Sequence, residues 1–169
     1  MPGLISKIRF TGRAGMKVLA AIVLLATLAL GGCVSTPVLP VPRPAPDAAG
    51  EVVIYRESAF AAGGVGLTVG ARGSGFAVLG NAEKVRVRLP AGEHEIFVRA
   101  RSAEPSRARV NVKTGATVCL RTSSSPDTYA KTVVPIVLMA TGYHFYLDEV
   151  PCPLDTALEK YKDVAVTYE

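Results

Sequence analysis

The sequence has no tryptophan, only two histidines and only three cysteines among 169 residues. Neither histidine, His94 or His144, lies at metal-ligand spacing from the other or from a cysteine. The serines at 123–125 are not part of a nucleophile-elbow motif. A catalytic site that joins His144 to Asp148 or Glu149 is conceivable, but nothing in the spacing requires it. We therefore predict a protein that is not an enzyme and that holds no metal and no cofactor.

The apolar run Val18–Leu30 is too short to cross a membrane. Its 13 residues would form a helix of about 20 Å, whereas the hydrocarbon core of a bilayer is ~30 Å thick. Four basic residues and no acidic residue precede the run, and the small residues Gly31 and Gly32 follow it. This order is typical of a secretory signal peptide, so we predict that residues 1–32 are removed.

The end of this leader, Leu30-Gly31-Gly32-Cys33, resembles the bacterial lipobox. The resemblance implies cleavage before Cys33, a diacylglyceryl group on its thiol and a third acyl chain on its amino group, an anchor far stronger than one chain. Val34 and Ser35, with no aspartate after the cysteine, are similar to the sorting signal of outer-membrane lipoproteins. The expected location is the outer membrane of a bacterial envelope, with the chain facing the periplasm.

The net charge of the mature chain is close to zero. The full sequence carries 19 basic and 14 acidic residues, and four of the basic ones lie in the predicted leader, which leaves 15 against 14, or +1. Nucleic-acid binding requires a basic domain, so we predict no nucleic-acid partner.

Acylation of Cys33 leaves Cys119 and Cys152 as a pair in an oxidising compartment. An even number of cysteines in such a compartment favours a disulfide. The bond would close a loop of about 34 residues and stabilise the fold by roughly 3–4 kcal/mol in the chain-entropy model.

Residues 33–50 are predicted to be a tether between the anchor and a domain at 51–169. Val34–Gly50 contains five prolines and almost no residue that could build a core. Proline-rich chain favours extended polyproline II, in which these residues would reach about 50 Å. A proline-rich ligand for a partner protein is the alternative interpretation.

From Glu51 onward, short segments with a period of two predict an antiparallel β-sandwich of about seven to eight strands, with a barrel as the alternative. Val52–Tyr55 is continuously apolar and is expected to be a central strand. In Lys84–Leu89, three lysine or arginine side chains alternate with three apolar ones, as in a half-buried strand. Further strands are expected at 67–71, 76–79, 107–113, 117–122 and 164–168.

Pro90-Ala91-Gly92-Glu93 supplies turn residues after Lys84–Leu89, and His94–Arg101 is predicted to return as the second strand of a hairpin. Glycines 64, 66 and 70 lack the strand and helix of a dinucleotide-binding motif and are expected to belong to a loop and a strand. Basic residues on the polar strand faces are expected to pair with interleaved glutamates, and an anion-binding face is the alternative.

One short helix is expected near the C-terminus. Leu154, Ala157, Leu158 and Tyr161 follow helical spacing, and Pro153 suits the first helical position. The apolar run Thr132–Ala140 is expected to be core, either helix or strand, and the aromatic group at 143–146 follows it.

Two short stretches carry a family resemblance. Val53-Ile54-Tyr55-Arg56 and Leu89-Pro90-Ala91-Gly92-Glu93-His94-Glu95-Ile96 resemble segments of small bacterial envelope lipoproteins with a domain of unknown function, similar in appearance to PEGA-type surface domains. The resemblance implies a β-sandwich on a lipid anchor and brings no catalytic residue or cofactor. Ala91 stands where those proteins have a second proline.

Our leading hypothesis is a non-enzymatic binding or structural module of the cell envelope, which binds or braces an envelope protein or a cell-wall component. An accessory subunit of an envelope complex is the second hypothesis. A periplasmic hydrolase that uses His144 is the third.

Overall fold

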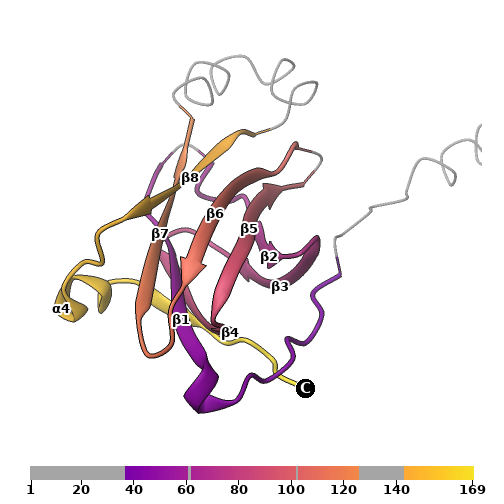
Figure 1. The fold of residues 1–169 in the computed structure, drawn as a ribbon. Helices are drawn as coiled ribbons and strands as arrows, with labels where there is room; N and C mark the ends of the chain where they lie inside the picture. Colours follow the sequence, from indigo (N-terminus) through magenta and orange to yellow (C-terminus); the bar gives the residue numbers. More distant parts are fainter. Residues whose placement is uncertain (1–36, 61, 102, 126–142) are drawn as a thin grey trace, which may run out of the picture. The chain divides into compact units, whose positions relative to one another are not determined.

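The computed structural model describes residues 37–60, 62–101, 103–125 and 143–169, and these residues form a β-sandwich (Figure 1). One sheet has the order β8-β7-β1-β4-β9 and the other has the order β3-β2-β5-β6. The first sheet consists of β8 (Phe145–Val150), β7 (Thr117–Ser124), β1 (Ala49–Arg56), β4 (Glu83–Pro90) and β9 (Lys162–Val164). The second consists of β3 (Ser74–Leu79), β2 (Leu67–Ala71), β5 (Gly92–Ala100) and β6 (Ser106–Val112).

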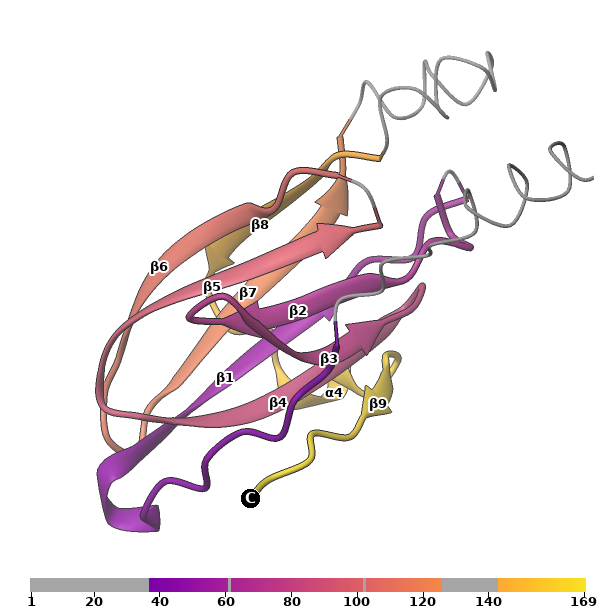
Figure 2. The same ribbon diagram turned by 90° about the vertical axis from the view of Figure 1, so that its right-hand side faces the viewer.

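The predicted sandwich is confirmed, with three differences in detail. The described residues contain nine strands, one more than the expected upper number. Most neighbouring strands are antiparallel, but β1 pairs in parallel with β7, and β4 pairs in parallel with β9. The expected strand at 164–168 is instead β9, which ends at Val164. Figure 2 looks onto the face of the second sheet, with the first sheet behind it.

Strand β1 is central, as predicted, and is buried on both faces. Val52 and Ile54 point into the core between the sheets and are fully buried. Val53 and Tyr55 point to the other face, where they pack with Leu158 and Tyr161 in a second apolar cluster. A strand that is covered on both faces is expected to be continuously apolar, which explains the run at 52–55.

The predicted hairpin between Lys84–Leu89 and His94–Arg101 is wrong. Strand β4 pairs with β1 and β9, whereas β5 pairs with β2 and β6, so the two strands lie in opposite sheets. Pro90–Gly92 crosses between the sheets, and the Ala91 amide donates a hydrogen bond to the Ala48 carbonyl (2.9 Å). Alternation shows which side chains face the core, but it is the same whether two strands pair or face each other across that core.

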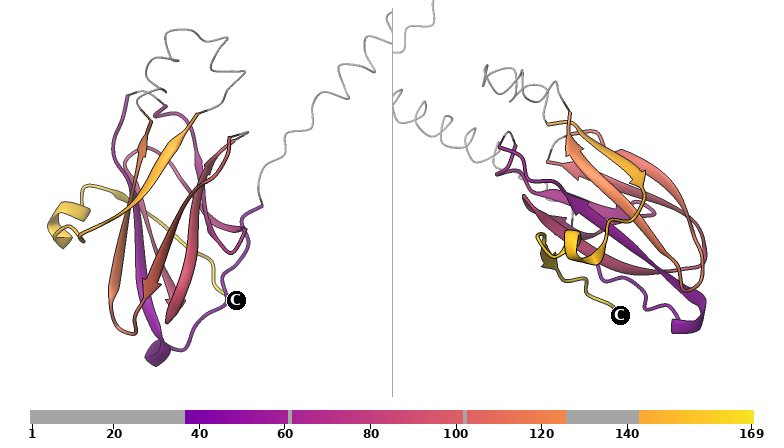
Figure 3. Two further views of the ribbon diagram at one scale, coloured as in Figure 1. Left: turned by 45° about the horizontal axis from the view of Figure 1, so that its top comes forward. Right: turned by 90° about the vertical axis from the view of Figure 1, so that its left-hand side faces the viewer.

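The C-terminal helix is present but shorter than predicted. Helix α4 (Asp155–Leu158) is a single turn, and Pro153 precedes its N-cap residue Leu154 instead of taking the first helical position. Leu158 is buried, whereas Leu154 is 78% exposed, so Leu154 is not part of the packed face. The helix covers the outer face of the first sheet, as the right-hand view of Figure 3 shows.

Lys84 was expected on a solvated strand face, but its side chain is buried beneath α4. The Lys84 Nζ donates hydrogen bonds to the carbonyls of Leu158 (3.0 Å) and Tyr161 (2.7 Å) and lies 3.0 Å from Asp163 Oδ2. Carbonyls at the end of a helix lack intrahelical donors, and a cation near them is favourable. Lys84 therefore attaches the C-terminal segment to the sheet.

The expected pairing of basic residues on the polar strand faces with glutamates is present for some of them. Arg107 pairs with Glu95 (3.1 Å) on the outer face of the second sheet. Arg86 pairs with Glu51 (3.1 Å) on the neighbouring strand. These pairs are partly exposed, so each is worth at most about 1 kcal/mol.

The predicted Cys119–Cys152 disulfide is present. It joins the central part of the first sheet to the segment that precedes α4, with a Cα–Cα distance of 5.0 Å, which lies within the usual range. Cys119 is buried and packs in the second apolar cluster with Val53 and Tyr55. The bond therefore fixes the C-terminal segment on the same sheet face that Lys84 holds.

The segment at 37–48 differs from the free tether that its prolines predict. The Leu39 amide donates a hydrogen bond to the Gly75 carbonyl on β3 (2.8 Å), and the Val41 amide donates one to the Thr167 carbonyl (2.9 Å). Val41 also packs against the core. Residues 38–42 thus form a strap along the side of the sandwich, and the chain beyond a short 3-10 turn at Pro46–Ala48 enters β1.

We expect Lys84→Met to lower the free energy of unfolding by about 1–3 kcal/mol, because two buried carbonyls lose a charged donor. Chemical denaturation of the oxidised protein measures this loss. Lys162→Met is the matched control, since its side chain is 81% exposed and its pairing with Glu83 is long (3.6 Å). Equal stability of the two variants would contradict the capping role of Lys84.

We also expect that the unfolded, unreduced domain has no thiol that reacts with an aromatic disulfide reagent, because Cys119 and Cys152 are bonded. Reduction should release two thiols. Two reactive thiols before reduction would disprove the bond in the isolated protein.

Candidate functional site

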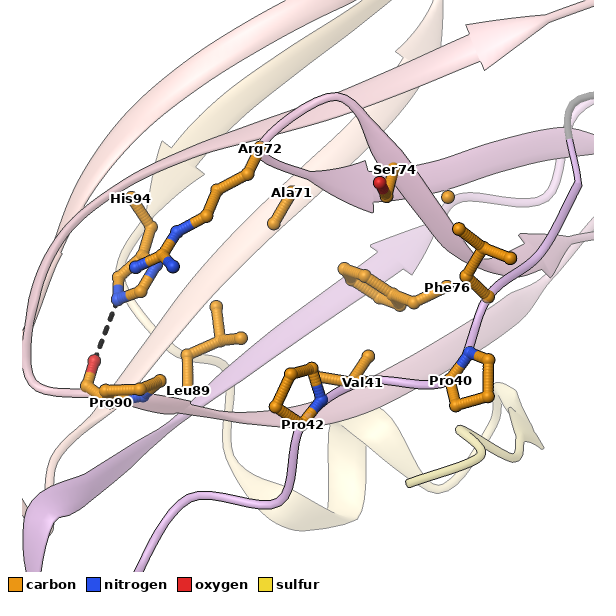
Figure 4. Close-up of a pocket in the computed structure, with 12 residues that line it drawn as sticks. Pro40, Val41, Pro42, Ala71, Arg72, Ser74, Phe76, Leu89, Pro90 and His94 are labelled. Carbon is orange, nitrogen blue, oxygen red and sulfur yellow. Dashed lines mark hydrogen bonds between the residues drawn. The ribbon is translucent and has the colours of Figure 1, made fainter. Parts of the chain in front are cut away.

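An apolar pocket lies between the strap and the open side of the sandwich (Figure 4). Its walls come from the strap (Val41 and Pro42), from the bulged part of β3 (Phe76) and from the end of β4 (Leu89). The cavity volume is about 140 Å³. A cavity of about 150 Å³ lined by apolar side chains accommodates a benzene ring, so this pocket has room for an apolar group of similar size.

His94 lines this pocket and is 4% exposed. Its Nε2 lies 2.8 Å from the Pro90 carbonyl oxygen, which can only accept, so Nε2 carries a hydrogen and donates it. The buried Nδ1 has no hydrogen-bond partner among the described residues. The bond to Pro90 fixes the crossover from β4 to β5, and this structural role explains why a histidine stands on the inner face of β5.

A positive charge lies beside the pocket. Arg72 is in the tight turn between β2 and β3, with a φ of 50° that few non-glycine residues adopt. Figure 4 shows its side chain pointing toward the His94 ring. The pocket therefore combines mainly apolar walls with one guanidinium and one imidazole, which suits binding of a small apolar group better than acid–base chemistry.

His144, the basis of the hydrolase hypothesis, lies away from this pocket. Its side chain is exposed at the residue before β8, and its carbonyl accepts a hydrogen bond from the Ser125 amide (3.0 Å). Asp148 and Glu149 are exposed on β8. The apolar run Thr132–Ala140, which precedes this region, lies outside the described residues.

The described residues contain no group of three or more histidine, cysteine, aspartate or glutamate side chains that could hold a metal ion. Among the same residues, no helix has both the length and the apolar character needed to cross a bilayer.

Arg56, at the end of β1, is a fully buried arginine in the described part of the chain. Its side chain is 1% exposed, and its guanidinium donates to the carbonyls of Val65, Ala62 (2.6 Å) and Leu79 (3.5 Å). The guanidinium carbon also lies 5.0 Å from the centre of the Phe145 ring, at cation–π distance. Burial lowers the pKa of Arg56, and the nearby carboxylate of Glu83 opposes that shift.

Arg56 explains the position of the glycine-containing segment 63–66. This segment connects β1 to β2 as a loop, as predicted. The carbonyls of Val65 and Ala62 turn inward to meet the guanidinium, which satisfies groups that would otherwise be buried without a donor. The loop is therefore a structural cap on a buried charge, and no feature of it resembles a phosphate-binding loop.

Sequence reasoning missed the pocket, because the strap that forms one of its walls was predicted to be a free tether. It also missed the burial of Arg56 and His94, since polar residues at strand positions are usually exposed. One signal was available for His94: it alternates in phase with Ile96 and Val98, which are buried.

The chain was compared with family models, with curated proteins and with solved structures, and none of these comparisons found a match.

We expect Arg56→Met to lower the free energy of unfolding by at least about 2 kcal/mol, since hydrogen bonds to a charged group contribute about 1.5–3 kcal/mol each. Thermal and chemical denaturation measure the loss, and limited proteolysis should show faster cleavage in 57–66. Arg56→Lys keeps the charge but loses the planar guanidinium, so its free energy of unfolding should lie between those of the Met variant and the wild type. A Met variant as stable as wild type would refute the capping role of Arg56.

Proposed function

We propose that this chain is an envelope lipoprotein, acylated at Cys33 and held on the periplasmic face of an outer membrane, and that its sandwich is a non-enzymatic binding or structural module. The observation that carries the proposal is the signal-peptide order that ends in Leu30-Gly31-Gly32-Cys33. The disulfide supports it, because such bonds persist in oxidising compartments such as the periplasm.

The construction of the domain supports a binding role over catalysis. The described basic residues that are buried, Arg56, Lys84 and His94, each hold backbone carbonyls in place. Their donor groups are thus engaged in maintaining the fold. The apolar pocket beside the strap offers a place for a small apolar group of a ligand or of a partner protein.

The partner in this proposal is an envelope protein or a cell-wall component. A role as accessory subunit of an envelope complex is a special case of the same proposal, in which the partner is a permanent assembly. Gentle extraction of the acylated protein followed by identification of bound protein and peptidoglycan fragments would distinguish a protein partner from a wall component.

We expect Cys33→Ser to abolish incorporation of radioactive palmitate and to leave an unprocessed precursor or a soluble periplasmic protein. The reason is that the substituted chain has no thiol at the modified position. Metabolic labelling, electrophoretic mobility and membrane fractionation measure the three effects, and Ser35→Ala serves as the neighbouring control. A cleaved Cys33→Ser protein that still fractionates with the membrane would disprove lipid anchoring.

A further inference from the structure

Exposed apolar side chains follow one edge of the sandwich. Six large hydrophobic residues of the described chain are exposed, and four of them lie along strand β3, which is the edge strand of its sheet. These four are Val38 (46% exposed), Leu39 (48%), Phe60 (103%) and Val78 (46%). We call them the β3-edge patch.

Backbone and side-chain contacts place the four residues relative to β3. Val38 forms an isolated bridge with Gly75, and Leu39 is hydrogen-bonded to the same residue near the start of the strand. Val78 lies on the strand itself. Phe60 follows Ala59, whose amide donates to the Asn81 side chain (3.0 Å) just beyond the end of the strand. The patch therefore runs the length of β3.

The other two exposed hydrophobic residues lie elsewhere. Tyr146 is on β8, at the far edge of the first sheet, and Leu154 precedes α4. Leu154 serves as a comparison for the patch within the same molecule. It is as apolar as the patch residues and more exposed than Val78 (78% against 46%).

The length of chain between the predicted anchor and the patch is short. Val38 is the fifth residue after Cys33, and five extended residues span at most about 17 Å. An acylated cysteine sits at the interface of the bilayer, so Val38, which pairs with Gly75 near the start of β3, lies within about 17 Å of that interface. The docking of the strap removes most of the reach of about 50 Å that a free proline-rich segment would have.

We propose that the β3-edge patch is a membrane-facing surface that rests on the headgroup region of the bilayer in which Cys33 is anchored. This proposal rests on the proposed acylation of Cys33. An exposed apolar patch on the surface of a domain marks an interaction surface. Here the lipid is the surface to which the covalent anchor at Cys33 holds the patch close. Arg72, at the turn that begins β3, adds a positive charge that anionic headgroups attract.

The test uses single-cysteine reporters in the acylated, disulfide-bonded mature protein. Its Cys33 is a thioether and its other two cysteines are bonded, so a new cysteine is the one free thiol. Val78→Cys and Leu154→Cys are labelled with an environment-sensitive fluorophore and reconstituted in vesicles of phosphatidylethanolamine and phosphatidylglycerol, with and without a nitroxide on the headgroup. Mass spectrometry first verifies acylation.

We expect the label at position 78 to be quenched several-fold more strongly than the label at position 154. Equal quenching at the two positions in verified acylated protein would overturn the membrane-facing surface while leaving the lipoprotein proposal intact. Absence of acylation at Cys33 would overturn both.

A second variant tests whether the apolar side chains make the contact. Leu39→Ser and Phe60→Ser are combined with the label at position 78. Both side chains are exposed, so the thermal midpoint should not change, and the quenching should fall. Unchanged quenching in this variant would show that chain length alone holds the edge near the lipid, and the patch would not be a docking surface.

Discussion

Strand β1 has apolar neighbours on both of its faces and strands on both of its sides. Each of these contacts is made by a different part of the chain. The inner face requires the second sheet. The outer face requires a cover, which α4, Tyr161 and the disulfide supply. Tyr55 and Tyr161 meet there with ring centres 5.1 Å apart, and burial, followed by the nearby Tyr161 hydroxyl, raises the pKa of Tyr55. The end of the strand places Arg56 where three backbone carbonyls accept hydrogen bonds from its guanidinium.

Two cations at this end of the first sheet, Arg56 on β1 and Lys84 on β4, are almost completely removed from water. Lys84 and Arg56 lie on neighbouring strands at the same end of the first sheet and hold carbonyls on its opposite faces, Lys84 beneath the C-terminal segment and Arg56 beneath the loop that leads to β2. A buried cation is costly unless several acceptors surround it. Its geometry is therefore specific, because only one arrangement of the loop or of the segment supplies those acceptors. Apolar packing alone would tolerate more than one position of either segment.

The sequence predicted what depends on local pattern and failed where distant segments meet. The alternation in 84–89, the apolar run at 52–55 and the cysteine pair each have one simple interpretation, and the structure agrees with it. The crossover at Pro90–Gly92, the buried Lys84 and the docked prolines depend on which segment lies opposite. Alternation, charge and proline content are the same for either partner. The pocket combines two such cases, since its walls come from the strap and from the crossover.

The strap also determines how the domain bears a load. The Val41 amide binds the Thr167 carbonyl, and the Glu169 amide binds the Val41 carbonyl, so the segment nearest the predicted anchor is hydrogen-bonded to the C-terminal tail and to the edge of β3. Tension applied through Cys33 acts first on these few edge bonds and reaches β1 only after they open. Peeling residues 38–48 from the sandwich would release about 35 Å of chain. Under force, the strap would thus detach and lengthen before the sandwich core unfolds.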